Sequence, residues 1–105
     1  MGAKSFAVTA PGATLTKAFW QAVTDAQFDH GHAGDTGTIA EKSAVREVRP
    51  PAGVSGEEAI REWAYGVLDD EITDPALAWI NSKWAPAAAV MLDRKTWFLF
   101  GWASS

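Results

Sequence analysis

The sequence predicts an α+β protein built in two layers, with a sheet of about four mostly antiparallel strands and two to three helices on one face. Apolar residues recur at helical spacing in separate stretches of the chain, and short alternating or apolar runs, bounded by glycine and proline, lie before, between and after them. In chain order these segments give β-α-β-α-α-β-β, which two layers can bury. At 105 residues the chain is expected to form a single domain, residues 1–105.

The first part of the chain predicts a strand followed by a long helix. Residues 6–9 alternate in the way a strand does, and the turn residues after them end it. Thr14 is a candidate N-cap for a helix that runs to about Phe28, because apolar residues follow it at helical spacing. Gly31 suits the left-handed position that ends such a helix, with His30 in its last turn.

The middle of the chain predicts two strand segments and two further helices. Residues 38–42 are interpreted as a strand, continued after a turn or bulge by residues 45–48. Ser55 and Glu58 have the spacing of a capping box, which predicts a helix with Ser55 as its N-cap and Glu58 at its third position. Asp74 before Pro75 predicts the start of a short third helix.

The end of the chain predicts a hairpin whose last strand is apolar on both sides. Residues 87–92 and 96–102 flank a three-residue polar turn. Since both faces of the last strand are apolar, we expect helices on one face and a subunit interface on the other. The interface candidates are Trp97, Phe98 and Trp102, and a homo-oligomer is the expected state.

Six tryptophans are many for a chain of this length. Trp63 and Trp84 lie on apolar helix stripes and are expected in the core, whereas Trp20 and Trp79 lie beside the stripes and are candidates for surface contact.

Composition excludes several classes of function. The formal net charge is −4 and no Lys/Arg cluster is present, so nucleic acid is a disfavoured partner. Without cysteine the chain has no disulfide, thiolate metal site or cysteine nucleophile, which fits a reducing, cytoplasmic location. The N-terminus does not have the pattern of a signal peptide, and no stretch is apolar enough to predict a membrane span.

The segment from residue 29 to residue 42 is the one that secondary-structure propensity does not explain. It holds both histidines of the chain and three glycines within seven residues. Four interpretations are open: an anion-binding cradle of backbone N–H groups, a metal site, an acid–base pair, or a purely structural turn. No nucleophile motif, cofactor motif or convincing metal motif is present, so no catalytic residue, cofactor or metal is assigned. If a ligand binds, the expected contacts are His30, His32, Asp35, Thr36 and Lys42.

The run Asp-His-Gly-His-Ala-Gly-Asp-Thr-Gly-Thr-Ile-Ala-Glu-Lys, residues 29–42, resembles a segment found in small proteins of bacteriophages and actinobacteria. Residues 83–86 and 100–103 resemble later segments of the same group. That group has no assigned activity to carry over, so the resemblance implies a context more than a chemistry. Small phage accessory proteins often act by binding a host protein or a signalling nucleotide.

These observations favour a small non-enzymatic binding protein, of the kind that phages use as accessory or anti-defence factors. Its partner would be a nucleotide-like small molecule or a host protein, besides further copies of itself. The alternative is a small hydrolase or phosphodiesterase that acts on a nucleotide through His30 and His32, with or without a metal.

Overall fold

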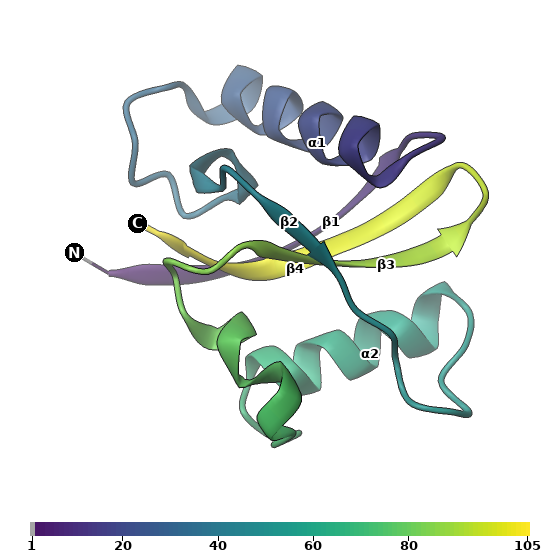
Figure 1. Cartoon of the computed structure of the whole chain (residues 1–105). Helices are drawn as coiled ribbons and strands as arrows, with labels where there is room; N and C mark the ends of the chain where they lie inside the picture. The colour runs from purple at the N-terminus through teal and green to yellow at the C-terminus, as the bar shows by residue number, and fades with distance from the viewer. Residues whose placement is uncertain (1) are drawn as a thin grey trace.

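The computed structural model describes residues 2–105 and has one four-stranded sheet (Figure 1). The elements in chain order are β1 (Ala3–Pro11), α1 (Leu15–His30), the 3₁₀ helix η1 (Ile39–Glu41), β2 (Val45–Glu47), α2 (Glu57–Leu68), the 3₁₀ helix η2 (Pro75–Asn81), β3 (Ala87–Asp93) and β4 (Thr96–Ser104). The strand order is β1-β4-β3-β2. β4 is antiparallel to β1 and to β3, whereas β2 is parallel to β3. The α+β class and the mostly antiparallel sheet are confirmed.

The helices cover both faces of the sheet, and here the prediction of helices on one face is wrong. In Figure 1, α1 lies above the sheet, while α2 and η2 lie below it. Two separate clusters of buried side chains correspond to these two layers. One cluster holds Phe19 and Val23 of α1, and the other holds Trp63 of α2 and Ile80 of η2. The protein therefore has three layers, with the sheet in the middle.

The alternation of β4 explains this arrangement. Trp97, Leu99 and Ala103 belong to the cluster under α1, whereas Phe98 and Phe100 belong to the cluster over α2. Side chains two apart in a strand share a face, so a strand that is apolar at every position needs cover on both sides. The chain supplies that cover itself, and a second subunit is not needed to bury β4.

Local capping signals fix two of the three longer helices. The Thr14 side chain accepts a hydrogen bond from the Lys17 backbone N–H at 3.2 Å, and α1 begins at the next residue, as predicted. The Asp74 side chain accepts from the Ala76 N–H at 2.9 Å, which confirms the predicted start of η2. The capping box at Ser55 is wrong, because Gly56 with φ of 86° occupies the N-cap position of α2 and makes no side-chain hydrogen bond.

The predicted strand at residues 38–42 is a 3₁₀ helix. Thr38 adopts an extended backbone and its hydroxyl accepts from the Ala40 N–H at 3.2 Å, so the chain turns at once into η1. Ile39 is buried against α1 by this turn. The predicted strand after it is confirmed as β2, and the hairpin of β3 and β4 is confirmed as well.

The tryptophans divide differently from the prediction at one position. Trp63 is buried and Trp20 is 49% exposed, as expected. Trp84 is 81% exposed, because η2 ends at Asn81 and the helical spacing that placed Trp84 in the core does not extend beyond it. Trp79 is half-buried, with the Arg46 guanidinium 4.9 Å from its ring centre.

Gly12 allows the turn between β1 and α1 to approach the helix. A Cβ atom on Gly12 would lie 2.5 Å from the backbone nitrogen of Ala18, which cannot move without displacing the helix. We therefore expect Gly12→Ala to lower the free energy of unfolding by about 2 kcal/mol, measured by chemical denaturation.

Gly66→Ala is the matched control for this substitution. Its new Cβ would meet the terminal methyl of Ile72 at 2.7 Å, a flexible group that can rotate away. The gain in helix propensity offsets part of the cost, so the loss should stay below about 1 kcal/mol. Equal losses for both variants would contradict the backbone contact at Gly12.

Candidate functional site

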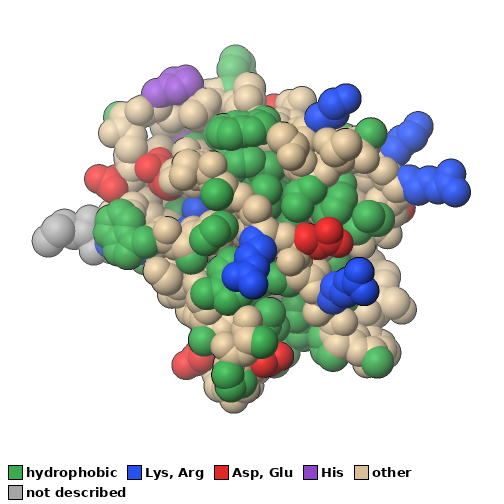
Figure 2. Space-filling view, viewed as in Figure 1, with side chains coloured by type: hydrophobic (Ala, Val, Ile, Leu, Met, Phe, Trp, Pro, Cys, Tyr) green, Lys and Arg blue, Asp and Glu red, His purple; other side chains and the backbone are tan. Residues whose placement is uncertain are grey.

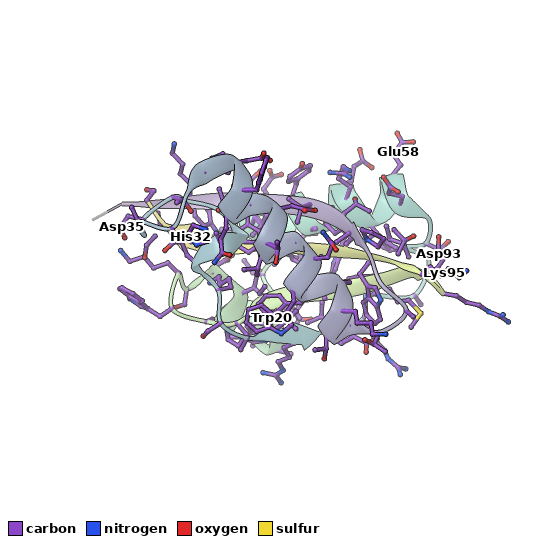
Figure 3. All side chains as sticks on the ribbon, turned by 90° about the horizontal axis from the view of Figure 1, so that it is seen from above. Trp20, His32, Asp35, Glu58, Asp93 and Lys95 are labelled. Atoms are coloured by element: carbon purple, nitrogen blue, oxygen red, sulfur yellow. The ribbon has the colours of Figure 1, made fainter. Side chains whose placement is uncertain are left out.

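The glycine- and histidine-rich segment forms an exposed loop at one end of the molecule. In Figure 3, His32 and Asp35 lie at the opposite end from the β3–β4 turn marked by Asp93 and Lys95. His30, His32 and Asp35 are exposed. Asp35 adopts a positive φ of 55°, a conformation that aspartate tolerates better than most residues. These three predicted ligand residues are therefore accessible to solvent.

Thr36 is occupied inside the loop. Its hydroxyl and its backbone N–H both donate to a Glu41 carboxylate oxygen, at 2.8 and 3.2 Å, and its hydroxyl lies 2.8 Å from that of Thr38. Partial burial alone would raise the pKa of Glu41, but hydrogen bonds from Thr36 and Asp35 outweigh that effect and lower the pKa below its ordinary value. The predicted ligand hydroxyl therefore holds the loop together.

Lys42 points into the protein and not towards a ligand. It is 6% exposed, and its ammonium donates to the backbone carbonyls of Lys83 at 3.1 Å and Ala85 at 2.6 Å. Burial lowers the pKa of this amine. Lys42 thus ties the end of η1 to the segment that enters β3.

The predicted interface residues lie mostly inside a single chain. Trp97 is 4% exposed and Phe98 is fully buried, each under helices of the same chain. Only Trp102 remains partly accessible. Within residues 2–105 no group of three or more His, Asp or Glu side chains is placed to hold a metal ion.

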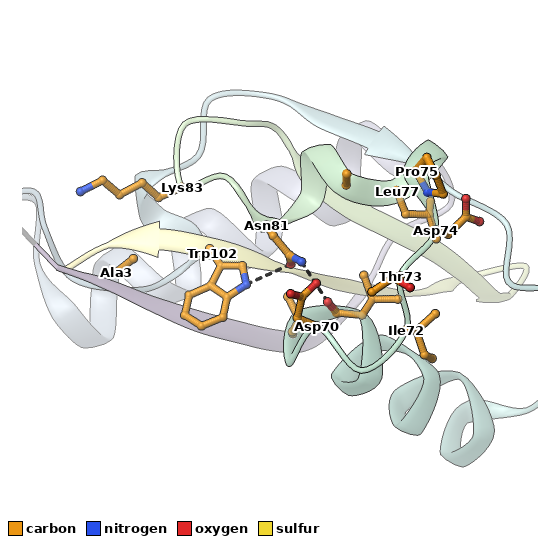
Figure 4. Close-up of a pocket in the computed structure, with 13 residues that line it drawn as sticks. Ala3, Asp70, Ile72, Thr73, Asp74, Pro75, Leu77, Asn81, Lys83 and Trp102 are labelled. Atoms are coloured by element: carbon orange, nitrogen blue, oxygen red, sulfur yellow. Dashed lines mark hydrogen bonds between the residues drawn. The ribbon is translucent and has the colours of Figure 1, made fainter.

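A groove of about 770 Å³ lies on the α2 face of the sheet (Figure 4). It lies between the end of α2, the helix η2 and the ends of β1 and β4, and we call it the Trp102 groove. Its apolar wall comes from Val67, Leu68 and Leu77, among other residues. A hollow of this size is in the range that holds small-molecule ligands.

Trp102 is held in this groove through its indole nitrogen. Its N–H donates to the Asn81 side-chain oxygen at 3.2 Å, and the Asn81 amide donates to the Val67 carbonyl at 3.1 Å. Figure 4 shows this chain of two hydrogen bonds crossing the groove from β4 to α2. Because the N–H has a partner, the indole is fixed in orientation while part of its surface stays open.

The wall of the Trp102 groove that follows α2 depends on a close approach of Ile72 to Gly66. After α2 the chain turns at Asp70, whose φ is 62°, and the N–H groups of Glu71 and Ile72 return to the Gly66 carbonyl at 2.9 and 3.0 Å. The Ile72 side chain then covers Gly66, where a Cβ atom would lie 2.7 Å from its terminal methyl. A glycine inside a helix signals such an approach, and that signal was present in the sequence.

Charged groups lie at the two ends of the groove. Lys83 is at one end, where its ammonium donates to the Gly2 carbonyl at 3.3 Å and lies 4.9 Å from the Trp84 ring centre. Asp74 is at the other end, and Asp70 lines the groove between these two ends (Figure 4). The groove therefore offers an aromatic surface with a cation at one end, a carboxylate at the other end and a second carboxylate between them.

The face of the molecule shown in Figure 2 carries apolar, basic and acidic side chains side by side. No helix within residues 2–105 has the length and apolarity needed to cross a bilayer.

Comparison with protein-family models, with curated proteins and with solved structures found no significant match to this chain.

The buried ammonium of Lys42 is expected to stabilise the fold. Lys42→Met removes a charged donor from two carbonyls and should lower the free energy of unfolding at neutral pH by about 2 kcal/mol. Burial lowers the folded-state pKa, so between that pKa and the unfolded value the unfolded chain binds more protons. In this window the contribution of Lys42 to stability rises with pH.

The measurement is chemical denaturation of both proteins from pH 7 towards pH 10. The difference between wild type and Lys42→Met should widen as pH rises, because all other titrating groups are common to both. A difference that stays flat or narrows would show that the ammonium is not destabilised by burial.

Proposed function

We propose that the protein is a non-enzymatic binding protein whose ligand is a small nucleotide-like molecule, held in the Trp102 groove. The observation that carries this proposal is the fixed, partly open indole of Trp102 within an apolar groove of about 770 Å³. It replaces the exposed loop as the preferred ligand site, since the Lys42 side chain is buried and the Thr36 hydroxyl is bound to Glu41 inside the loop.

An aromatic ring is the natural occupant next to Trp102. Indole surfaces stack on the faces of purines and pyrimidines, a contact that contributes about 1–3 kcal/mol per base. A fixed indole loses little conformational freedom when a ligand stacks on it. The hydrogen bond to Asn81 supplies that fixation.

The distribution of charge along the groove selects the rest of the ligand. Lys83, at one end of the groove, is the cation available to a phosphate attached to a stacked nucleoside. Asp70 and Asp74 are acceptors for the amino group of a base or the hydroxyls of a ribose. A nucleoside monophosphate satisfies all three requirements at once.

Binding is favoured over hydrolysis by the position of the histidines. Both histidines of the chain, His30 and His32, lie outside the residues that line the Trp102 groove. A hydrolase that relied on them would have to act at the exposed loop, where the described side chains do not assemble a metal site. The resemblance of residues 29–42 to bacteriophage proteins supports an accessory role of the anti-defence type as the context for such binding.

Adenosine 5′-monophosphate is a suitable probe, observed by ¹H–¹⁵N NMR. We expect it to shift the indole N–H signal of Trp102, and we expect Trp102→Ala to weaken binding at least about tenfold by removing the stacking surface. Trp102→Phe keeps a ring and should retain most of the affinity. Trp20→Ala is the matched control, because Trp20 is a partly exposed tryptophan on α1, across the sheet.

The same titration tests the alternatives. No shift at Trp102 with millimolar nucleotide would contradict the proposal. Shifts confined to His30 and His32 would return the site to the loop, and release of phosphate during the titration would favour the hydrolase. Thermal unfolding of each variant separates loss of binding from loss of fold.

The proposed contact between Lys83 and the ligand phosphate can be tested separately. Lys83→Gln should weaken adenosine monophosphate several-fold and leave adenosine unchanged, because only the monophosphate carries the charge that the ammonium meets. The effect should shrink at high salt. Equal losses of affinity for adenosine monophosphate and adenosine would show that the phosphate does not meet Lys83.

A further inference from the structure

The two edges of the sheet differ in how well they are protected. β2 is three residues long, carries Arg46 and Glu47, and is followed by two prolines. β1 is nine residues long and its only charged residue is Lys4. Open edges of this length are normally shortened, charged or covered, because they present unpaired backbone groups to other strands.

The hydrogen-bond pattern shows which groups of β1 are unpaired. Gly2 and Ser105 exchange both backbone hydrogen bonds, and the Gly12 N–H donates to the Lys95 carbonyl at 2.8 Å. The register between β1 and β4 has no shift, so even-numbered residues of β1 bond to β4. The N–H and carbonyl groups of Ala3, Ser5, Ala7 and Thr9 therefore point away from the sheet.

A second hollow lies along this edge. It measures about 380 Å³ and is bounded by residues 5–9 of β1, by the second half of α1 and by residues 37–39. Asp25 and Asp29 stand on its wall and both are exposed. The edge therefore suits an extended segment that carries a positive charge and no negative one.

We propose that this segment is β1 of a second copy, so that two sheets join into one eight-stranded sheet across a two-fold axis. β1 is already extended, it exposes the matching set of backbone groups, and Lys4 gives it a single positive charge. This moves the predicted homo-oligomer interface from the two faces of β4, where Trp97 and Phe98 lie, to the open edge of β1. It does not depend on the proposed ligand.

The geometry favours a register with Phe6 opposite Phe6 of the second copy. Ser5 then pairs with Ala7, and Ala3 with Thr9, so all four outward residues of each copy exchange backbone hydrogen bonds. Lys4 lies opposite Val8 of the second copy, on the face that α1 covers. Asp25 lines the same groove as Val8, which brings the ammonium and the carboxylate to the same place.

A charge exchange between Lys4 and Asp25 tests the proposal. We expect sedimentation equilibrium to show a dimer for the wild type, and Lys4→Glu and Asp25→Lys each to raise the dissociation constant about tenfold, since each puts like charges together twice per dimer. The double variant restores opposite charges and should return to within about threefold of wild type. Both residues are exposed, so the fold should survive each change.

Amide hydrogen exchange tests the strand pairing directly. In the dimer the amides of Ser5, Ala7 and Thr9 should be protected, and on dilution below the dissociation constant they should exchange rapidly while Phe6 and Val8 stay protected. A chain that remains monomeric at millimolar concentration overturns the proposal. So does a dimer in which the Ser5 and Ala7 amides exchange freely, or one that the charge exchange does not restore.

Discussion

The apolar character of β4 on both faces is the constraint that organises this protein. Phe98 and Leu99 are both fully buried, although adjacent residues of a strand point in opposite directions. Removing both from water requires a layer on each side of the sheet. The chain meets this requirement with α1 on one side and with α2 and η2 on the other. The placement of β4 in the interior of the sheet, between β1 and β3, follows from the same need.

The Trp102 groove arises where this cover is incomplete. Near its end β4 still carries a large aromatic residue, but α2 has already ended and η2 crosses at some distance. The indole is kept in place by Asn81, which is itself held by a carbonyl of α2. The loop that closes the groove folds back onto Gly66 because no side chain occupies that position. The Trp102 groove, with its ordered indole surface, therefore results from the way α2, η2 and β4 pack together.

The glycine- and histidine-rich loop shows why residue type alone is a weak guide to chemistry. Thr36, Glu41 and Lys42 have the polar groups that a ligand site would use, but these groups form hydrogen bonds within the chain. The Thr36 hydroxyl donates a hydrogen bond to the partly buried Glu41 carboxylate. The Lys42 ammonium donates to two backbone carbonyls more than 40 positions away in the sequence. The exposed side chains of the loop, such as those of His32 and Asp35, have their polar groups in solvent.

The sequence by itself determined the features that depend on neighbours a few residues away. The caps at Thr14 and Asp74, the helical stripe of α1 and the β3–β4 hairpin rest on hydrogen bonds and periodicity within one element or between two neighbouring elements, so local chemistry was sufficient. Tertiary structure decided which face each helix covers, why Trp84 lies outside and why residues 39–41 turn instead of extending. It also decided the pairing of Trp102 with Asn81 and the burial of Lys42. These outcomes depend on contacts between distant segments, and the free energy of such contacts is set only when the whole sheet has assembled.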